Sequence, residues 1–423
     1  MWMVLPSDEE EFLQIKNRTF NMYVLLQIKS LVFNPPKMVH RQLTEPIQAA
    51  AQTMPVVSIT GPRQSGKTTL AQMAFPGHAY VNLEYLPTRQ YALENPIGLL
   101  EQYPDGLIVD EAQYAPELFS YIQVQVDKTR KNGAYILTGS QNFLMMERIT
   151  QSLAGRVAVF HLLPFSANEL ENTPYQLDKP FEYIVKGFYP RIYDQGALPD
   201  VFYPSYLLTY LERDVRLLKN IGDLASFERF VRLCAGRIGQ VFNQSSLAND
   251  TGLSQPTIRS WFSVLETSFV TFLLPPYFRN YNKRLIKTPK IYFYDTGLAC
   301  SLLGIRSARE LENHPSRGAL FENYVLVEMM KQFLNRGRRP PCYFWRDSAG
   351  HEIDLLVEDG EKLYPMEIKS TQTLRSDFFK NLEFFQKLSD TPPEQSFLIY
   401  GGTENQNRLR GFVRGWDQLP SFG

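Results

Sequence analysis

The residues best suited to chemistry begin at Gly61. The pattern GxxxxGK[ST] is formed by Gly61, Pro62, Arg63, Gln64, Ser65, Gly66, Lys67 and Thr68. In such a loop the glycines let backbone N–H groups approach phosphates, and the N-terminus of the following helix favours the phosphate charge. Lys67 is expected to reach the β- and γ-phosphates and Thr68 to offer its hydroxyl to Mg²⁺, while Thr69 continues the first helical turn. The run from Gly61 to Thr69 therefore predicts a site for ATP and Mg²⁺.

A pair of acidic residues follows the apolar run Leu107–Val109. We expect Asp110 to hold the metal through water, and Glu111 to orient or deprotonate the water that attacks the γ-phosphate. The alternative is a strand end whose two acids are simply solvated. The preceding phosphate loop favours the catalytic interpretation.

Two further residues are candidates for contact with the γ-phosphate. Ser140 ends the run Ile136-Leu-Thr-Gly and is our first choice as a sensor, with Thr138 as the second. Arg156 follows a glycine in Leu-Ala-Gly-Arg, which suits an arginine that reaches the phosphate of a neighbouring subunit. The alternative for Arg156 is a local ion pair with an acid.

A second set of acids lies near the C-terminus. Two strands are joined by a turn at Asp359-Gly360. The first strand carries Asp354, and the second carries Glu367 and Lys369. With a period of two, Ile353 shares a face with Leu355 and Val357, opposite to Asp354, so the polar groups converge.

An upstream helix adds Glu322 to these acids. The combination of Asp354, Glu367, Lys369 and Glu322 resembles the PD-(D/E)xK nuclease fold, in which two carboxylates hold Mg²⁺ and the lysine positions or activates water. The alternative is a domain that keeps this architecture for DNA binding or as a structural unit.

Short apolar strands alternate with helical segments in the part of the chain that carries the phosphate loop. Strands are predicted at 56–60, 79–83, 107–110, 134–138 and 157–163, and a helix at 67–74. Buried parallel strands read as continuous apolar runs, and their alternation with helices indicates βαβ units. We therefore predict an α/β three-layer sandwich for this part.

Beyond residue 164 the pattern is mostly helical, with an apolar period over 206–218. The segment 245–267 is typical of a helix-turn-helix, with Ser246 and Ser254 as caps and with Ile258, Phe262 and Leu265 facing inward. A winged-helix module follows from this pattern. Its candidate contacts to DNA phosphates are Arg259, Arg279, Lys283, Arg284, Lys287 and Lys290, with Tyr277, Phe278 and Tyr281 interleaved. The alternative is a winged helix that packs on protein.

Composition restricts the class of protein further. The 423 residues predict two or three domains, and 44 basic against 44 acidic residues exclude a globally basic nucleic-acid-binding chain. The three cysteines lack zinc-site spacing and favour a cytoplasmic location. No stretch is long and apolar enough for a membrane span, and the acids at 8–11 argue against an export signal.

In order and spacing, the motifs GPRQSGKTT, LIVDEAQ, LTGSQNF and SLAGR resemble the AAA+ family of bacterial and archaeal ATPases that carry a C-terminal domain of unknown function, DUF4143. The resemblance runs from about Met38 to the C-terminus. It implies an AAA+ core, an arginine finger at Arg156, and a homo-oligomeric, hexameric ring in which each site is completed by its neighbour. Gln141 stands where most relatives have a small residue. Arg213 lies in a further family motif, and its role is either a contact to phosphate or an ordinary ion pair.

These observations together divide the chain and set the functional hypothesis. The expected parts are an extension at 1–37 that precedes a candidate native start at Met38, an AAA+ core at 38–165, a helical lid or linker at 166–230, a winged-helix-like module at 231–317 and a nuclease-like α/β domain at 318–423. The hypothesis is an ATP- and Mg²⁺-dependent oligomeric machine acting on DNA. Two alternatives stay open: a nucleotide switch that signals through protein contacts, and an ATP-gated nuclease without motor action.

Overall fold

The phosphate-loop motif lies on a parallel sheet. The computed structural model describes residues 38–140, 149, 151–210, 223–278 and 287–422. Within them, five parallel strands pair in the order β2-β3-β4-β1-β5. Their bounds are β1 Val56–Thr60, β2 Ala79–Asn82, β3 Leu107–Asp110, β4 Tyr135–Gly139 and β5 Val157–His161. The predicted strands are confirmed, with ends that differ by one or two residues for β2, β4 and β5.

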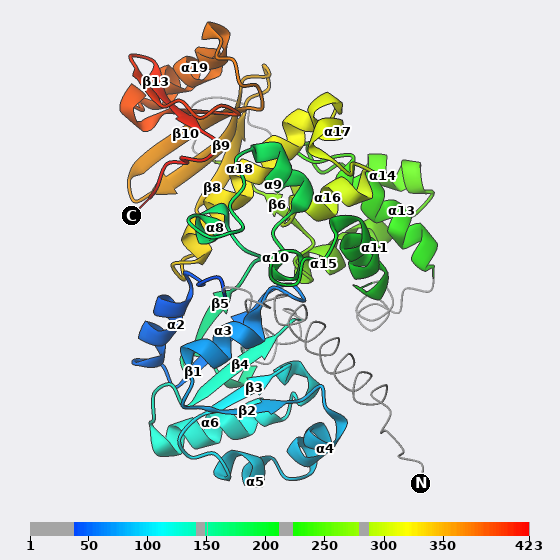
Figure 1. Cartoon of the computed structure of the whole chain (residues 1–423), viewed down its shortest axis with the longest axis vertical. Helices are drawn as coiled ribbons and strands as arrows, with labels where there is room; N and C mark the ends of the chain where they lie inside the picture. The colour runs from blue at the N-terminus through cyan, green and yellow to red at the C-terminus, as the bar shows by residue number, and fades with distance from the viewer. Residues whose placement is uncertain (1–37, 141–148, 150, 211–222, 279–286, 423) are drawn as a thin grey trace, which may run out of the picture. The chain divides into compact units, whose positions relative to one another are not determined.

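Helices cover both faces of this sheet (Figure 1). They are α2 Thr44–Ala51, α3 Lys67–Ala74, α4 Leu86–Glu94, α5 Pro96–Glu101 and α6 Leu118–Thr129, with a 3₁₀ turn at Ala112–Tyr114. Alternate strand residues point to opposite faces, so Ile108 packs with α2 and α3 while Val109 packs with α5 and α6. Each fully buried side chain of this kind contributes roughly 1.5–3 kcal/mol. The predicted three-layer α/β sandwich is confirmed.

A helical region follows the sheet. Its helices are α8 Ala167–Leu170, α9 Pro180–Lys186, α10 Pro190–Asp194, α11 Pro199–Tyr210, α13 Leu224–Ala235, α14 Gln244–Thr251, α15 Gln255–Thr267, α16 Thr296–Leu302 and α17 Ala308–Asn313. The predicted helix at 206–218 is described only as far as Tyr210. Arg213 lies outside the described residues.

The predicted helix-turn-helix corresponds to α14 and α15. Ser254 caps α15 by accepting a hydrogen bond from the Thr257 amide, as predicted. The prediction for Ser246 is wrong, because the helix begins earlier and Asn243 is the cap, with the Ser246 amide as its donor. An antiparallel pair, β6 Thr271–Leu274 and β7 Lys290–Phe293, follows the helices.

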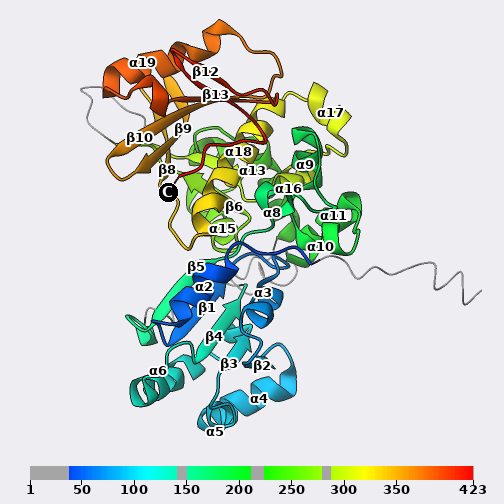
Figure 2. The ribbon, with the colours of Figure 1, turned by 60° about the vertical axis from the view of Figure 1, so that its left-hand side comes forward.

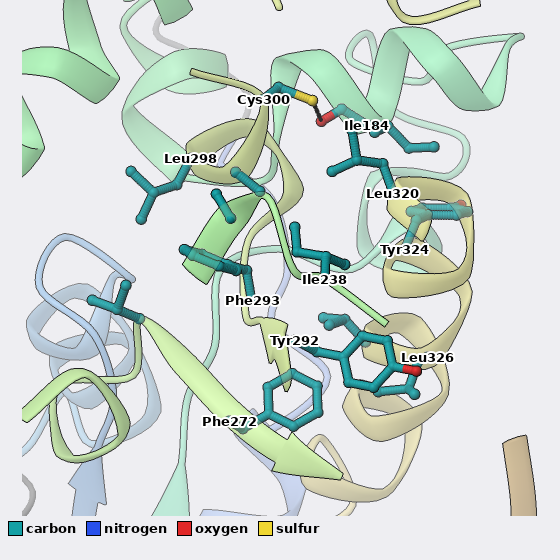
Figure 3. Packing of buried hydrophobic residues seen from close by; sticks show 14 of the residues in the cluster. Ile184, Ile238, Phe272, Tyr292, Phe293, Leu298, Cys300, Leu320, Tyr324 and Leu326 are labelled. Carbon is teal, nitrogen blue, oxygen red and sulfur yellow. Dashed lines mark hydrogen bonds between the residues drawn. The ribbon is translucent and has the colours of Figure 1, made fainter. Parts of the chain in front are cut away.

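A large apolar core joins this helical region to the next long helix, α18 Arg317–Leu334 (Figure 3). Phe272 of β6 stacks on Tyr292 of β7 with 5.7 Å between ring centroids. The thiol of Cys300 lies 3.7 Å from the Ile184 carbonyl oxygen. All three cysteines are buried and unpaired, and burial raises the pKa of each thiol, so they act as apolar core residues.

The C-terminal part contains a mixed sheet, seen at the top of Figure 2, with six strands among the described residues in the order β12-β13-β11-β10-β9-β8. Their bounds are β8 Cys342–Arg346, β9 Glu352–Asp359, β10 Lys362–Lys369, β11 Phe397–Tyr400, β12 Gln406–Arg408 and β13 Gly411–Gly415. Helix α18 packs on one face and α19 Lys380–Ser389 on the other, and short 3₁₀ turns lie at Ser376–Phe379 and Pro393–Gln395.

One face prediction for β9 is wrong. Leu355 and Val357 pack with α18, whereas Ile353 packs with α19. The register between β8 and β9 shifts at Tyr343/Trp345, and such a bulge inserts a residue that reverses the alternation of side chains.

No helix among the described residues is long and apolar enough to cross a membrane. The hypothesis of a non-native extension before Met38 lies outside those residues.

Candidate functional site

The phosphate loop runs from the end of β1 into α3. Gly61 and Gly66 have φ angles of 154° and 93°, which a side chain would strain, and a Cβ on Gly61 would lie 2.1 Å from the Leu162 carbonyl oxygen. Lys67 begins α3, and its ammonium donates to the carbonyl oxygens of Gly61 and Pro62 at 3.0 and 2.7 Å. The lysine is therefore held inside the loop, where phosphate oxygens would replace the carbonyls as acceptors.

The other loop residues differ in exposure. Gln64 and Thr69 are exposed, Arg63 is half-buried, and Ser65 is fully buried. Gln64 has a positive φ of 59°, which places it at the bend of the loop. The Ser65 hydroxyl is buried and accepts or donates no hydrogen bond among the described residues.

Arg41, which precedes α2, binds the backbone of the phosphate loop. Its guanidinium donates to the carbonyl oxygens of Ser65 at 2.8 Å and Leu163 at 2.6 Å. It also forms a 3.0 Å ion pair with Glu169 of α8, and both side chains are buried. Arg41 therefore links the loop to the chain beyond β5, and truncating it would remove the donor to two carbonyls and the cation that pairs with Glu169.

Hydroxyl groups surround Asp110 at the end of β3. Thr68 donates to its carboxylate at 2.9 Å, Tyr80 of β2 donates at 2.8 Å, and Thr138 of β4 also donates. Desolvation, followed by the hydrogen bond to Asp110 and the charge of that carboxylate, raises the pKa of the Tyr80 hydroxyl. All these donors are neutral, and no lysine, arginine or histidine of the described residues forms an ion pair with Asp110. A carboxylate beside a threonine hydroxyl is an oxygen-rich arrangement that suits Mg²⁺.

Glu111 occupies the next position with a left-handed backbone, φ 55°. Its carboxylate accepts hydrogen bonds from Ser140 at 3.2 Å and from the Gln113 side chain. Positive φ is uncommon outside glycine and is often found at functional sites. The turn directs the acid away from the line of β3 and beside Ser140, the residue predicted as the sensor.

Arg156 lies at the end of the strands opposite to the phosphate loop. It directly precedes β5, whereas the phosphate loop follows β1, and β1 runs parallel to β5 with Val56 opposite Val157. Arg156 forms a two-pronged ion pair with Asp127 of α6, at 2.6 and 2.9 Å, and this contact lowers the pKa of Asp127. A strand of this length spans on the order of 15 Å. Arg156 therefore lies about the length of a strand away from the phosphate loop of its own chain.

The residues of this site fit ATP and Mg²⁺. Gly66 is the N-cap of α3 and supplies no side-chain acceptor, so the first amides of α3 point toward the loop without one. The first turn carries no acid that would repel a phosphate. Lys67 supplies a positive charge and Thr68 with Asp110 the oxygen ligands.

The C-terminal acids form a separate cluster on β9 and β10. The Lys369 ammonium lies 2.6 Å from Glu367 and 3.6 Å from Asp354. Asp354 also accepts a hydrogen bond from the Ile368 amide at 2.8 Å. One oxygen of Glu367 is buried without a hydrogen-bond partner, and burial, then the Asp354 charge, raises the pKa of Glu367 to about 8.

Glu322 joins this cluster from α18, but it binds a different lysine. Lys290 of β7 is 3% exposed, lies 3.3 Å from Glu322 and also pairs with Glu352 of β9. Tyr292 donates a hydrogen bond to Glu322. Burial raises the pKa of Glu322 to about 7, with Lys290 acting in the opposite direction. No three acidic, histidine or cysteine side chains in the described part of the chain are grouped closely enough to share a metal ion.

Sequence reasoning missed three residues of these sites. Tyr80 could have been found from strand pairing, because β2 and β3 place it opposite Ile108, two residues before Asp110. Arg41 carries no motif signal, since two of its partners are backbone carbonyls and the third, Glu169, is distant in the sequence. Lys290 was assigned to a surface for DNA, and this assignment is wrong because β7 buries it between α18 and β9.

The other predicted DNA contacts have mixed outcomes. Arg259 of α15 and Lys287 are exposed. Tyr277 is buried and donates to Glu358, so its ring is not available for stacking, whereas Phe278 is 59% exposed. The remaining basic and aromatic candidates at 279–286, and Gln141, lie outside the described residues.

Family models match three consecutive parts of the chain. An AAA domain matches residues 53–171, a domain of unknown function (DUF8612) matches 177–309, and another (DUF4143) matches 317–417. Two relatives, the uncharacterized proteins Mb2031c of Mycobacterium bovis and Rv2008c of Mycobacterium tuberculosis, are each 30% identical over 339 residues, which is 77% of this chain and 73% of each relative.

Among solved structures, a similar one is the Walker-type ATPase PABY2304 of Pyrococcus abyssi, with 15% identity and a TM-score of 0.43, covering 63% of this chain and 96% of that one. The family models and the long matches to the two mycobacterial proteins agree with the resemblance carried by the motifs. The chain belongs to the family of P-loop ATPases in which an AAA domain is joined to a C-terminal DUF4143 domain.

Proposed function

We propose that this chain binds ATP with Mg²⁺ and hydrolyses it to ADP and phosphate. The observation that carries the proposal is the 2.9 Å contact between Thr68, at the start of α3, and Asp110, at the end of β3. It joins the phosphate loop to an acid whose other partners are neutral hydroxyls. That combination provides a place for a metal ion next to a place for phosphates.

Each residue has a separate role in this proposal. The backbone N–H groups of Gly61 and of residues 63–69 hold the phosphates, and Lys67 neutralises the β- and γ-phosphate oxygens. Thr68 and Asp110 would hold Mg²⁺, which would supply charge stabilisation at the transferred phosphoryl group. Glu111 orients the attacking water and accepts its proton, while Ser140 holds the Glu111 carboxylate and senses the γ-phosphate.

Phosphate release measured with purified protein tests this function. Wild type is expected to turn over ATP in Mg²⁺ and to stop in excess EDTA. Lys67→Ala, which removes the phosphate-binding cation, is expected to be inactive, whereas Lys131→Ala, a change of an exposed lysine at the opposite edge of the sheet, retains activity. Equal rates for wild type and Lys67→Ala would reject the proposed site.

We further propose that Arg156 acts on the ATP of a neighbouring subunit within a ring. Arg156 lies at the end of the strands opposite to the phosphate loop of its own chain, and this position supports the role. For Arg156 to reach the neighbour, its ion pair with Asp127 must break at the subunit contact.

Mixing two inactive variants tests action between subunits. Arg156→Ala keeps an intact loop, and Lys67→Ala keeps an intact arginine. If the arginine acts on a neighbour, mixed assemblies regain part of the wild-type rate. Asp127→Ala, which removes only the local partner, is expected to stay active. A mixture that remains inactive, together with a monomeric mass in solution in the presence of ATP, would reject the ring.

DNA is the partner that we propose for the helix-turn-helix. Arg259 is exposed on the second helix, α15, and Lys287 is exposed on the segment before β7. ATP turnover measured against single-stranded, duplex and branched DNA tests this partner. Stimulation that Arg259→Gln weakens, while the exposed Arg309→Gln on α17 does not, is the expected result. Indifference to every DNA favours the alternative of a switch that signals through protein contacts.

For the C-terminal domain, the ion pairs favour a binding or structural unit over a DNA-cleaving one. Lys369 contacts Asp354 and Glu367, and Lys290 contacts Glu322, so each acid that a nuclease site would need for metal already has a cationic partner. Incubation of wild type with duplex, branched and single-stranded DNA in Mg²⁺ or Mn²⁺ is expected to leave the DNA intact. Cleavage that Asp354→Asn abolishes would instead establish the ATP-gated nuclease.

A further inference from the structure

A cavity of about 550 Å³ lies beside the outer edge of the ATPase sheet, away from both acid clusters. Its walls come from β5, from the segment around β6, and from the C-terminal end of α18 with the turn that follows. Ligand sites in proteins are typically roughly 300–1,000 Å³. The volume therefore suits a small organic molecule.

The walls combine aromatic side chains with positive charge. Phe269, Phe272 and Tyr294 contribute rings, while Arg338 and Arg339 contribute guanidinium groups. No acidic side chain lines the cavity among the described residues. Arg338 has a partner, Asp359 at 3.3 Å, and Arg339 is exposed with no ion pair among the described residues. This lining is complementary to an anion with an apolar body.

The strand β5 adds backbone hydrogen-bonding groups to this cavity. It is an edge strand that pairs only with β1 in the described residues. The Arg156 carbonyl accepts a hydrogen bond from β1 and the Leu162 N–H donates one to it, so the backbone groups of even-numbered residues of β5 point toward β1. The backbone N–H and C=O groups of Val159 and His161 therefore point away from β1. Both residues line the cavity. Burial lowers the pKa of His161, so its ring is neutral at pH 7.

The same end of β5 contacts the start of the phosphate loop. The His161 ring nitrogen Nδ1 lies 2.7 Å from the Thr60 hydroxyl, directly before Gly61. The next residue, Leu162, places its carbonyl where a Cβ on Gly61 would be, at 2.1 Å. A ligand that shifts His161 therefore acts on the phosphate loop through Thr60 and Leu162 alone.

We infer that this cavity binds a small anionic molecule with an aromatic or aliphatic body, and that its occupancy alters nucleotide handling through the contacts of His161 with Thr60 and of Leu162 with Gly61. The second part rests on the proposed ATPase function. The first part does not, and it is tested separately.

Binding is measured with the fluorescent aromatic sulfonate 8-anilinonaphthalene-1-sulfonate, titrated into the full chain carrying Lys67→Ala so that the phosphate loop does not compete. Saturable binding of one probe per chain is expected. Arg339→Gln removes one guanidinium contact and is expected to weaken binding five- to tenfold. Leu273→Trp fills the cavity from β6 and is expected to abolish binding.

The matched control is Arg309→Gln, which removes an exposed arginine of α17 outside the cavity and is expected to leave binding unchanged. Thermal unfolding of Leu273→Trp checks that the variant folds. Binding that is not saturable, or that is equal in Arg339→Gln, Leu273→Trp and the control, would overturn the cavity as the site.

Competitors then distinguish the two kinds of ligand body. Displacement of the probe by adenosine 5′-monophosphate indicates an aromatic anion, and displacement by dodecanoate indicates an aliphatic one. Displacement by neither, at concentrations up to 1,000 times that of the probe, would overturn the inferred ligand class.

The coupling is measured in the wild-type loop as ATP turnover with and without saturating probe. A change of at least twofold that Leu273→Trp abolishes is expected. An unchanged rate in protein that binds the probe would overturn the coupling alone. Absence of any ATP turnover would count against the proposed ATPase function and leave the binding result standing.

Discussion

Two clusters of acids in this chain hold their carboxylates in different ways. Around Asp110 and Glu111 the side-chain donors among the described residues are hydroxyl and amide groups, which carry no net charge. Around Glu322 and Glu367 the partners include the ammonium groups of Lys290 and Lys369. Neutral donors orient a carboxylate and leave its charge available to a cation, whereas a buried ammonium already compensates it.

This difference separates the two clusters by function more clearly than their residue types do. Both contain a pair of acids and a lysine. In the first, Lys67 faces loop carbonyls and is separated from Asp110 by Thr68. In the second, Lys369 lies between Glu367 and Asp354. This difference is the basis for proposing a metal–phosphate site at the first cluster and a binding or structural role for the second.

The largest expected effect is that of Glu111→Gln on ATP hydrolysis. The amide keeps the size and hydrogen-bonding reach of the side chain but does not accept the proton of water, so turnover is expected to fall roughly 10²- to 10⁴-fold. ATP binding, measured by titration calorimetry, should stay within about threefold of wild type, because phosphate contacts come from the loop. Turnover near the wild-type rate would remove Glu111 from this role. Glu117→Gln, at an exposed acid before α6, is the matched control.

Lys290→Met sharpens the comparison at the C-terminal cluster. It leaves Glu322 and Glu352 without their buried cation, so the free energy of unfolding is expected to fall by about 3–5 kcal/mol in urea. Added Mn²⁺ should then stabilise the variant against unfolding but not wild type, since the carboxylates become available. The exposed Lys287→Met is the control. An equal response of wild type to Mn²⁺ would show that the lysine does not compete with metal.

A smaller effect is predicted for the pH dependence of stability through Glu367. Its pKa is raised from the ordinary value of 4.5 to about 8 in the folded chain, so the folded state binds this proton more tightly. The stabilising contribution is present below pH 4.5 and is lost as pH rises to about 8. Glu367→Gln removes this dependence.

Urea unfolding between pH 5 and pH 8 measures this contribution. Wild type is expected to lose roughly 1–3 kcal/mol more than Glu367→Gln over that range. Parallel curves for the two proteins would show that Glu367 ionises normally in the folded chain.

The smallest effect is expected from Tyr80→Phe, which removes one of the neutral donors to Asp110. The Mg²⁺ concentration for half-maximal ATP turnover should change about two- to fivefold, because one exposed hydrogen bond to a charged group is lost. Tyr121→Phe, at an exposed tyrosine of α6, should have no effect. A Mg²⁺ requirement identical to that of wild type would show that Tyr80 does not position Asp110.

The sequence predicted what local patterns determine. Apolar runs bounded by turn residues located β1 and β3 to the residue, and the phosphate-loop pattern located the start of α3 at Lys67. The cap of α14 was misplaced because Asn243 and Ser246 are both good caps and only the turn geometry selects between them. The face of Ile353 was misassigned because a bulge leaves no composition signal.

Long-range partners were beyond the sequence for a different physical reason. Lys290 pairs with Glu322 of α18 and Glu352 of β9 only through the tertiary fold, and nothing near Lys290 in the chain indicates those neighbours. Arg41 binds backbone carbonyls, which every residue carries. Such contacts depend on tertiary packing, and periodicity does not report it.

Titration calorimetry with Mg²⁺ and the non-hydrolysable analogue adenylyl imidodiphosphate tests the central claim most directly. The account predicts one site per chain in wild type, retained in Lys290→Met and lost in Lys67→Ala. Failure of wild type to bind the analogue in Mg²⁺, or equal binding by Lys67→Ala, would contradict it.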